Sequence, residues 1–391
     1  MDRRLYGGLS RALIAPVVAA VAMLGWSGPA HAQACAEALA GTGWRPPSAV
    51  SSAGALDFED LVAGLSKKRV VMIGEVHDRY EHHLNQLALI CRLHRQHPDL
   101  AIGLEFFQQP FQQPLDAYVE RRIDTREMLA KTEYFSRWQF DYRLYAPILE
   151  FARQHGIPLV ALNASQEISS KVAREGISAL SEAERAQLPA QLDHNNLPGY
   201  RKRLRAVFEQ HPEIQHMSFD NFVEAQLVWD ETMAKQAARY LEAHPDKFLV
   251  VLAGDGHVVR SGIPARFARL SGVEPLTVLQ GQSKEIAPED GDYLLLSEAV
   301  ELPPSGKLGV MLDTRDDRVV VSDFSEDSAA KDAGILKQDQ IVKLDGEFIA
   351  SFADLKLILM DKRPGDPVSV TVERAGSGQM TREASFSVTL R

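Results

Sequence analysis

Cysteine is scarce in this chain of 391 residues, and the chain carries no net positive charge. The two cysteines are Cys35 and Cys91. Cys91 lies on the apolar side of a helix predicted over 81–96, which favours a buried thiol over a redox centre. Whether the two cysteines form a disulfide is left undecided by the sequence, although an oxidising compartment would permit one. The formal net charge of −10 argues against nonspecific binding to nucleic acid or to anionic lipid.

Long apolar segments are absent after residue 32. The apolar run over 12–26 follows arginines at positions 3, 4 and 11 and precedes Ala30-His31-Ala32, which fits a signal-peptidase site. The run is shorter than the ~20 residues of a membrane span, which favours a cleaved signal peptide over an anchor. We therefore expect residues 1–32 to be a signal peptide and the chain to be exported to the periplasm or the outer membrane. Cys35 would accept a lipid if a weak lipoprotein signal is used.

The remaining chain is too long for a single hydrophobic core, so two domains are expected. In the first domain, short continuous apolar segments alternate with helical patterns. This alternation predicts an α/β fold with a mainly parallel sheet covered by helices. Beyond a linker, short β-type segments interrupted by two short helices predict a β-rich module. The expected strands of the first domain are 70–73, 101–104, 158–162 and 248–253, and the expected divisions are 33–281 for the first domain, 282–306 for the linker and 307–391 for the module.

The C-terminal module contains Leu308-Gly309-Val310-Met311, followed by the segments 328–335 and 338–346 and a helical segment over 354–360. In this order the segments resemble the PDZ family. The resemblance implies that residues 308–311 form a loop whose N–H groups hold the C-terminus of a peptide or protein, while an edge strand accepts an added strand. A PDZ fold that docks only onto its own partner domain stays open as the alternative. The module contains no Ser/His/Asp set, so it is not itself a protease.

Polar side chains follow the carboxyl end of each predicted strand of the first domain. Because the carboxyl ends of parallel strands meet at one edge of a sheet, where ligands bind, we expect these side chains to line one cleft. They are Glu75, His77, Glu105, Asn163 and His257. Gln226 and Asp230 lie four residues apart on a helix predicted over 219–243 and are expected to support the cleft.

Several chemistries fit these residues. Two histidines with carboxylates can hold a divalent metal that keeps an open position for water. Glu75 and His77 can equally act as a metal-free acid/base pair. Tyr145 opens a predicted helix among polar neighbours, and a tyrosine phenolate can ligate ferric haem.

Six segments occur in an order that suggests a family: 74–78, 103–106, 145–147, 160–163, 226–234 and 254–257. They resemble the ChaN family of bacterial haem-binding proteins, which shares a superfamily with Tiki metalloproteases, TraB proteins and erythromycin esterases. The resemblance covers about residues 57–280. It implies haem uptake at the cell envelope, with haem held between two subunits of a homodimer and tyrosine as the iron ligand. Tyr145 or Tyr142 would be that ligand, and Arg143 lies close enough in sequence to pair with a haem propionate.

Three hypotheses follow. The leading one is a periplasmic haem carrier, not an enzyme, whose PDZ module captures a peptide or protein partner. The second is a hydrolase, either metal-dependent like the Tiki proteases or based on His and Glu like the esterases. The third is an envelope scaffold whose PDZ module makes the functional contacts. Because no Cys-x-x-Cys-His motif is present, haem rests mainly on the resemblance.

Overall fold

The computed structural model describes residues 35–190, 192, 199–214, 217–281, 287, 290–315, 318–375 and 381–391. The expected signal peptide, residues 1–32, lies outside these described residues, and export stays a prediction. Across the described ranges, none of the helices combines the length and the apolar character that a membrane crossing needs. Cys35 and Cys91 are both buried as free thiols.

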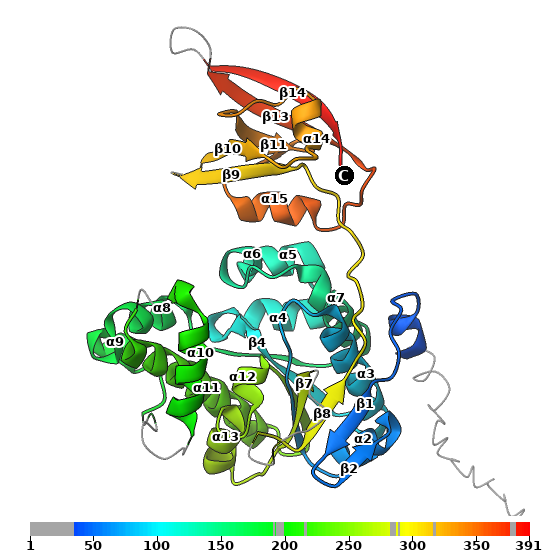
Figure 1. The fold of residues 1–391 in the computed structure, drawn as a ribbon, viewed down its shortest axis with the longest axis vertical. Helices are drawn as coiled ribbons and strands as arrows, with labels where there is room; N and C mark the ends of the chain where they lie inside the picture. Colours follow the sequence, from blue (N-terminus) through cyan, green and yellow to red (C-terminus); the bar gives the residue numbers. More distant parts are fainter. Residues whose placement is uncertain are drawn as a thin grey trace, which may run out of the picture.

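The first domain is built on an eight-stranded sheet in the order β2-β1-β8-β7-β3-β6-β4-β5 (Figure 1). The pairs from β8 through β5 are all parallel, whereas β1 pairs with β8 and with β2 in antiparallel fashion. This arrangement confirms the predicted α/β fold with a mainly parallel sheet. The strands are β1 (Ser48–Ser51), β2 (Gly54–Leu56), β3 (Val70–Ile73), β4 (Leu100–Gln108), β5 (Leu159–Asn163), β6 (Phe248–Leu252), β7 (Leu276–Gly281) and β8 (Tyr293–Leu296).

Alternate residues of the central strand β3 enter two different hydrophobic cores, because successive side chains of a strand point to opposite faces. Val71 and Ile73 join the core under helices α2 to α7, and Val70 and Met72 join the core under α11 to α13. Helices therefore cover both faces of the sheet (Figure 1). The helices of the two faces are α2 (Phe58–Leu65), α3 (Tyr80–Gln96), α4 (Gln112–Val119), α5 (Thr125–Lys131), α6 (Tyr134–Arg137), α7 (Tyr142–His155), α11 (Phe219–Ala243), α12 (Asp255–Val258) and α13 (Ile263–Ser271).

A helical excursion between β5 and α11 packs onto one side of α11 and has small apolar clusters of its own. Its helices lie together at the left of the view in Figure 1. Its helices are α8 (Gln166–Glu175), α9 (Glu182–Arg185) and α10 (Tyr200–Gln210). Short 3-10 turns also occur: η1 (Gln109–Phe111), η2 (Ile177–Ala179) and η3 (Pro212–Ile214).

The C-terminal module is an antiparallel sheet in the order β14-β13-β11-β10-β9, with β12 paired to β11 and β9 at one edge. Its helix α15 packs against α5 and α6 of the first domain (Figure 1). Arg126 and Glu347 form an ion pair across the same interface. The elements are β9 (Val310–Arg315), β10 (Arg318–Phe324), α14 (Ala329–Asp332), β11 (Gln340–Leu344), β12 (Glu347–Phe348), α15 (Phe352–Leu359), β13 (Pro367–Ala375) and β14 (Thr381–Thr389).

Candidate functional site

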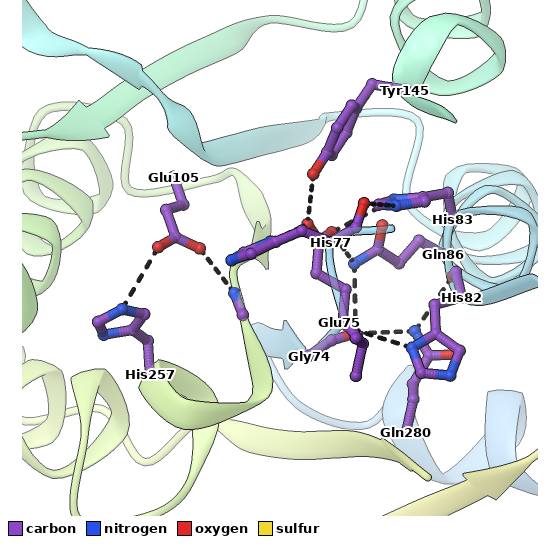
Figure 2. A network of polar contacts seen from close by, with 12 residues as sticks. Gly74, Glu75, His77, His82, His83, Gln86, Glu105, Tyr145, His257 and Gln280 are labelled. Atoms are coloured by element: carbon purple, nitrogen blue, oxygen red, sulfur yellow. Dashed lines mark hydrogen bonds and ion pairs between the residues drawn. The ribbon is translucent and has the colours of Figure 1, made fainter. Parts of the chain in front are cut away.

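The polar residues that follow the central strands gather at one edge of the sheet (Figure 2). Glu75 and His77 come directly after β3, Glu105 lies near the end of β4, and His257 lies on α12 after β6. They form two hydrogen-bonded networks that meet near Gly254. The parallel strand order explains this convergence, since β3, β6 and β4 are neighbours that all point the same way.

Glu75 is the centre of the first network and is 2% exposed. Its Oε1 accepts hydrogen bonds from the Tyr145 hydroxyl and from Nδ1 of His77, both at 2.8 Å, and its Oε2 accepts one from Nε2 of Gln86 at 2.8 Å. Nδ1 of His83 lies 3.4 Å from Oε2. Burial acts to raise the pKa of the Glu75 carboxyl, but His83 and His77 outweigh burial and hold the pKa well below its usual value. Glu75 is therefore an ionised buried carboxylate.

The His77 ring packs against two aromatic rings that also contact each other, with its centroid 4.9 Å from that of Trp138 and 5.0 Å from that of Phe140. Its side chain is 28% exposed. Burial acts to lower the pKa of the imidazole, but the hydrogen bond to Glu75 and the charge of Glu105 raise it to about 9. The ring is therefore protonated at neutral pH, and it is a proton donor and a cation there, not a base.

The second network surrounds His257. Nδ1 of His257 lies 2.6 Å from Oδ1 of Asp230, and the Tyr200 hydroxyl donates to Oδ2 of the same carboxylate at 2.8 Å. Nε2 of His257 lies 3.4 Å from Oε1 of Glu105, whose Oε2 accepts a hydrogen bond from the Gly254 amide at 2.6 Å. Burial acts to lower the pKa of His257, but the charges of Glu105 and Asp230 outweigh burial and raise it. Asp230 thus supports the site by holding this histidine.

Two glycines let the networks approach one another closely. A Cβ on Gly74 would lie 1.9 Å from Oδ1 of Asp255, and a Cβ on Gly254 would lie 3.0 Å from Cε1 of His77. Burial, together with the charge of Glu75, raises the pKa of Asp255 to about 7. Contact with Asp255 therefore requires the glycine before Glu75, and the glycine after β6 lets the His77 ring lie close to the backbone.

Several residues of the networks were not among the sequence predictions, and Tyr200 of the second network is one of them. Gln280, at the end of β7, donates from Nε2 to the carbonyl of Gly74 at 2.7 Å, and the strand-end rule applied to β7 would have found it. His83 and Gln86 lie on the buried face of α3. In the sequence they could have been found as two polar residues, three positions apart, on the helix face that is expected to be apolar.

A cleft of about 400 Å³ adjoins the second network, between the ends of β4 and β5 and the helices α8 and α11. Of the predicted residues, Glu105, Asn163 and Gln226 line it. Its volume falls within the ~300–1,000 Å³ of small-molecule sites. The large aromatic and apolar side chains of its lining are Phe106, Trp138, Ile214, Met217, Phe222 and Trp229.

The three residues that the family resemblance assigned to haem do not line this cleft, although the Tyr145 ring lies 4.2 Å from the ring of Phe106, which does. Tyr145 and Tyr142 are buried. Burial, with the charge of Glu75 in the case of Tyr145, holds the pKa of Tyr145 well above 10, and burial does the same for Tyr142. Arg143 donates to Asp141 at 2.6 Å and to the carbonyl of Pro303 at 2.5 Å, on the side that faces the C-terminal module. As folded, all three are engaged within the protein, and their role in haem binding stays a prediction.

The sequence also predicted that His77 and His257, together with carboxylates, could hold a divalent metal. Within the described ranges, histidine, cysteine and acidic side chains form no group of three or more that could hold a metal ion. His77 and His257 each have a carboxylate within 2.8 Å of Nδ1. The two rings are thus oriented by separate carboxylates.

The predicted peptide-binding loop, residues 308–311, lies in the C-terminal module at the start of β9. Gly309 has φ of +73°, a left-handed conformation that favours glycine. A Cβ at this position would lie 2.6 Å from Cα of Ser328. Both facts explain why the loop carries glycine here.

Two parts of the chain match known families. Residues 61–267 match the family described as "Haem-binding uptake, Tiki superfamily, ChaN", and residues 306–388 match the PDZ domain. ChaN of Campylobacter jejuni, whose structure is described as showing cofacial haem binding, matches 65% of this chain and 98% of that chain, at 19% identity and a TM-score of 0.53. An erythromycin esterase mutant in its open conformation matches 66% of this chain and 82% of that chain, at 14% identity and a TM-score of 0.37.

A plant protein is also similar. The chloroplastic Protein RETICULATA-RELATED 5 of Arabidopsis thaliana is 26% identical over 205 residues, which are 49% of this chain. The match covers 28% of the plant protein, so this chain spans well under half of that relative's length.

Proposed function

The chain belongs to the ChaN family of haem-binding uptake proteins in the Tiki superfamily, and from this membership we propose that it binds haem in the cleft at the carboxyl edge of its sheet. The match over residues 61–267, more than half of the chain, is the observation that carries the proposal. The cleft supports it, because its apolar lining suits a porphyrin and its size suits a small-molecule ligand.

Two kinds of side chain in the cleft complement haem. Phe106, Trp138 and Trp229 offer flat apolar rings against which a porphyrin can pack. Arg137 lines the same cleft, where its guanidinium forms ion pairs with Glu133 at 2.7 Å and Glu167 at 2.9 Å, so a propionate would take the place of one of these two exposed carboxylates. In the proposal Arg137, in place of the distant Arg143, pairs with a propionate.

The iron ligand in the proposal is Tyr145, as the family resemblance implies. To bind ferric iron, the buried Tyr145 hydroxyl would have to leave Glu75, reach the cleft that Phe106 lines, and lose its proton against a pKa held well above 10 by burial and by Glu75. Binding through Tyr145 should therefore release a proton and give a tyrosinate absorption band. Tyr145→Phe should remove the band while Tyr142→Phe keeps it. The family resemblance also implies that two subunits share the haem. Added haemin should therefore raise the fraction of dimer measured by sedimentation.

Haemin titration of a variant with a filled cleft tests where the haem binds. Ala225 is buried and lines the cleft, so Ala225→Trp places an indole where the porphyrin would lie. We expect saturable binding to the wild type, weakened at least about tenfold in Ala225→Trp. Ala243→Trp, at the exposed end of the same helix, should bind haemin as the wild type does. Equal affinity in all three chains would contradict binding in the cleft, and linear, unsaturable uptake by the wild type would contradict haem binding itself.

A metal-independent hydrolase is the second candidate, and the Glu75–His77 pair is the observation that favours it. With a pKa of about 9, His77 would act as a general acid towards a leaving group at neutral pH. Activity towards peptides or esters should then fall as pH rises through about 9, and His77→Asn should abolish it. An activity that survives His77→Asn contradicts this candidate.

The C-terminal module is proposed to capture the C-terminus of a peptide or protein. The φ of Gly309 and the close approach of Ser328 predict that Gly309→Val distorts the loop and prevents capture.

Export is proposed from the sequence alone. N-terminal mass spectrometry of envelope protein should find a chain that starts at Gln33 or at a lipidated Cys35, and an intact Met1 in the cytoplasm would contradict export.

A further inference from the structure

A cavity of about 780 Å³ lies between the two domains, separate from the proposed haem cleft. One wall comes from the C-terminal module, with residues 308–312 of the binding loop and β9 facing residues of α15. The other wall comes from the first domain, where residues 139–141 and Arg143 lie at the turn between α6 and α7. Residues 302–307 of the connecting segment close one end. The predicted peptide groove is therefore enclosed on a second side by the first domain.

The module's wall has the features that hold an added peptide strand. β9 is an edge strand, bonded to β10 on one side. The carbonyl of Leu308 accepts from the Ala330 amide at 2.9 Å, and the carbonyl of Gly309 accepts from the Ser325 amide at 3.0 Å. The amide N–H groups of Leu308 and Gly309 have no acceptor in the described part of the chain. Those N–H groups are the donors that a terminal carboxylate requires.

The first domain's wall is an aromatic turn. Gln139 is exposed and has φ of +69°, and Phe140 follows it into the cavity lining. The Phe140 ring also lies 5.0 Å from the ring of His77. Since α15 packs against α5 and α6, and Arg126 bonds Glu347, the turn is held opposite the groove. A peptide added to β9 therefore lies alongside this turn.

Charge and exposure indicate what the cavity accepts. Lys307 and Lys356 line it, are exposed, and form no ion pair among the described residues, although the charge of Lys356 helps to lower the pKa of the Asp141 carboxyl. Arg143, in contrast, is neutralised by Asp141. Met311 and Phe352 leave 55% and 45% of their surface exposed in the same lining. Two available cations beside apolar side chains fit a peptide that ends in an apolar residue with a free carboxylate.

We propose that this cavity is one peptide-binding site built by both domains, in which the 139–141 turn of the haem-binding domain contacts the peptide that the PDZ loop holds. This inference rests on the proposed peptide capture and adds that the first domain supplies part of the site. Phe140 belongs to the cavity wall and to the surroundings of His77 at once. Because the Phe140 ring lies 5.5 Å from the ring of Trp138, which lines the proposed haem cleft, the bound peptide would lie close to that cleft.

A single charge placed on the first domain tests the inference. Gln139→Glu keeps the shape of an exposed side chain and adds a negative charge to the cavity wall, more than 160 residues before the PDZ loop in sequence. The probe is a pool of fluorescein-labelled peptides of about eight residues that end in Leu, Val, Ala or Phe with a free carboxylate, titrated into the two-domain chain. Coulomb repulsion at roughly 10 Å should raise Kd about three- to tenfold, and high salt should remove most of the difference.

Controls separate this inference from the proposed capture. Gln210→Glu adds the same charge on α10, outside the cavity lining, and should bind peptide as the wild type does. Amidated peptides should bind weakly to all chains, since they lack the carboxylate. If the wild type binds the pool and Gln139→Glu binds it equally well, the two-domain site is refuted while PDZ capture stands. If the wild type binds no member of the pool, capture itself is refuted, and the two-domain site with it.

Discussion

Replacing Glu75 with glutamine removes the charge on which the first network depends. The carboxylate accepts hydrogen bonds from Tyr145, His77 and Gln86. Glutamine has the same shape and keeps one acceptor oxygen, so the fold around it should persist. What is lost is the negative charge beside the His77 ring, which makes the pKa of His77 the direct reporter of the substitution.

The size of the effect follows from the pKa of His77, which rises from 6.5 to about 9 in the folded chain. Each unit of pKa corresponds to about 1.4 kcal/mol, so the protonated ring is favoured by roughly 3 kcal/mol. Glu75 supplies the hydrogen bond and part of the charge behind this, while Glu105 and Asp255 remain in the variant. We expect the pKa of His77 in Glu75→Gln to fall by roughly two units, to about 7.

Stability against pH should change in a matching way. A histidine whose pKa is raised by folding contributes stability that is fully present below its unfolded pKa of about 6.5 and is lost as pH rises through the folded pKa. The wild type should therefore lose up to roughly 3 kcal/mol of unfolding free energy between about pH 6.5 and 9.5 through this group. Glu75→Gln should lose much less over the same window.

The assay is an NMR titration of the His77 ring, with its signal assigned by the loss of one resonance in His77→Asn. Urea unfolding at about pH 6.5 and 9.5 supplies the stability values. Asp78→Asn removes an exposed negative charge one residue away and should leave the pKa of His77 near its wild-type value. A pKa that stays near 9 in Glu75→Gln would refute the account of this network.

Two further predictions concern the buried framework. Arg266→Met removes a buried guanidinium that lies 3.3 Å from Glu231. Because buried carboxylates then lose a partner, the unfolding free energy measured by urea denaturation should fall by about 3–5 kcal/mol. A loss below about 1 kcal/mol would contradict this prediction. Gly74→Ala forces a methyl group against Asp255 and should cost about 1–3 kcal/mol, whereas Gly281→Ala, with its nearest neighbour at 3.6 Å, should be nearly neutral. Thermal or urea unfolding of both alanine variants decides this, and equal stability would contradict it.

The parallel sheet was predictable because its strands are short, continuously apolar segments, which two-sided burial requires. The meeting of Glu75, Glu105 and His257 followed from that sheet, since strand ends share an edge. The fate of Tyr145 did not follow, because its burial against Glu75 depends on how α7 is rotated on its neighbours. The position of Arg143 could not be predicted for another reason: it faces the C-terminal module, and no pattern in one sequence says how two domains pack.

The central claim is that this chain carries haem in the cleft of its first domain. The most direct measurement is the absorbance spectrum and iron content of the chain purified from cells supplied with haem, beside Ala225→Trp and a known haem-binding protein purified in the same way. The account predicts a Soret band and stoichiometric haem iron in the wild type, both lost in Ala225→Trp. A colourless, iron-free wild type from cells in which the reference protein is loaded with haem would contradict it.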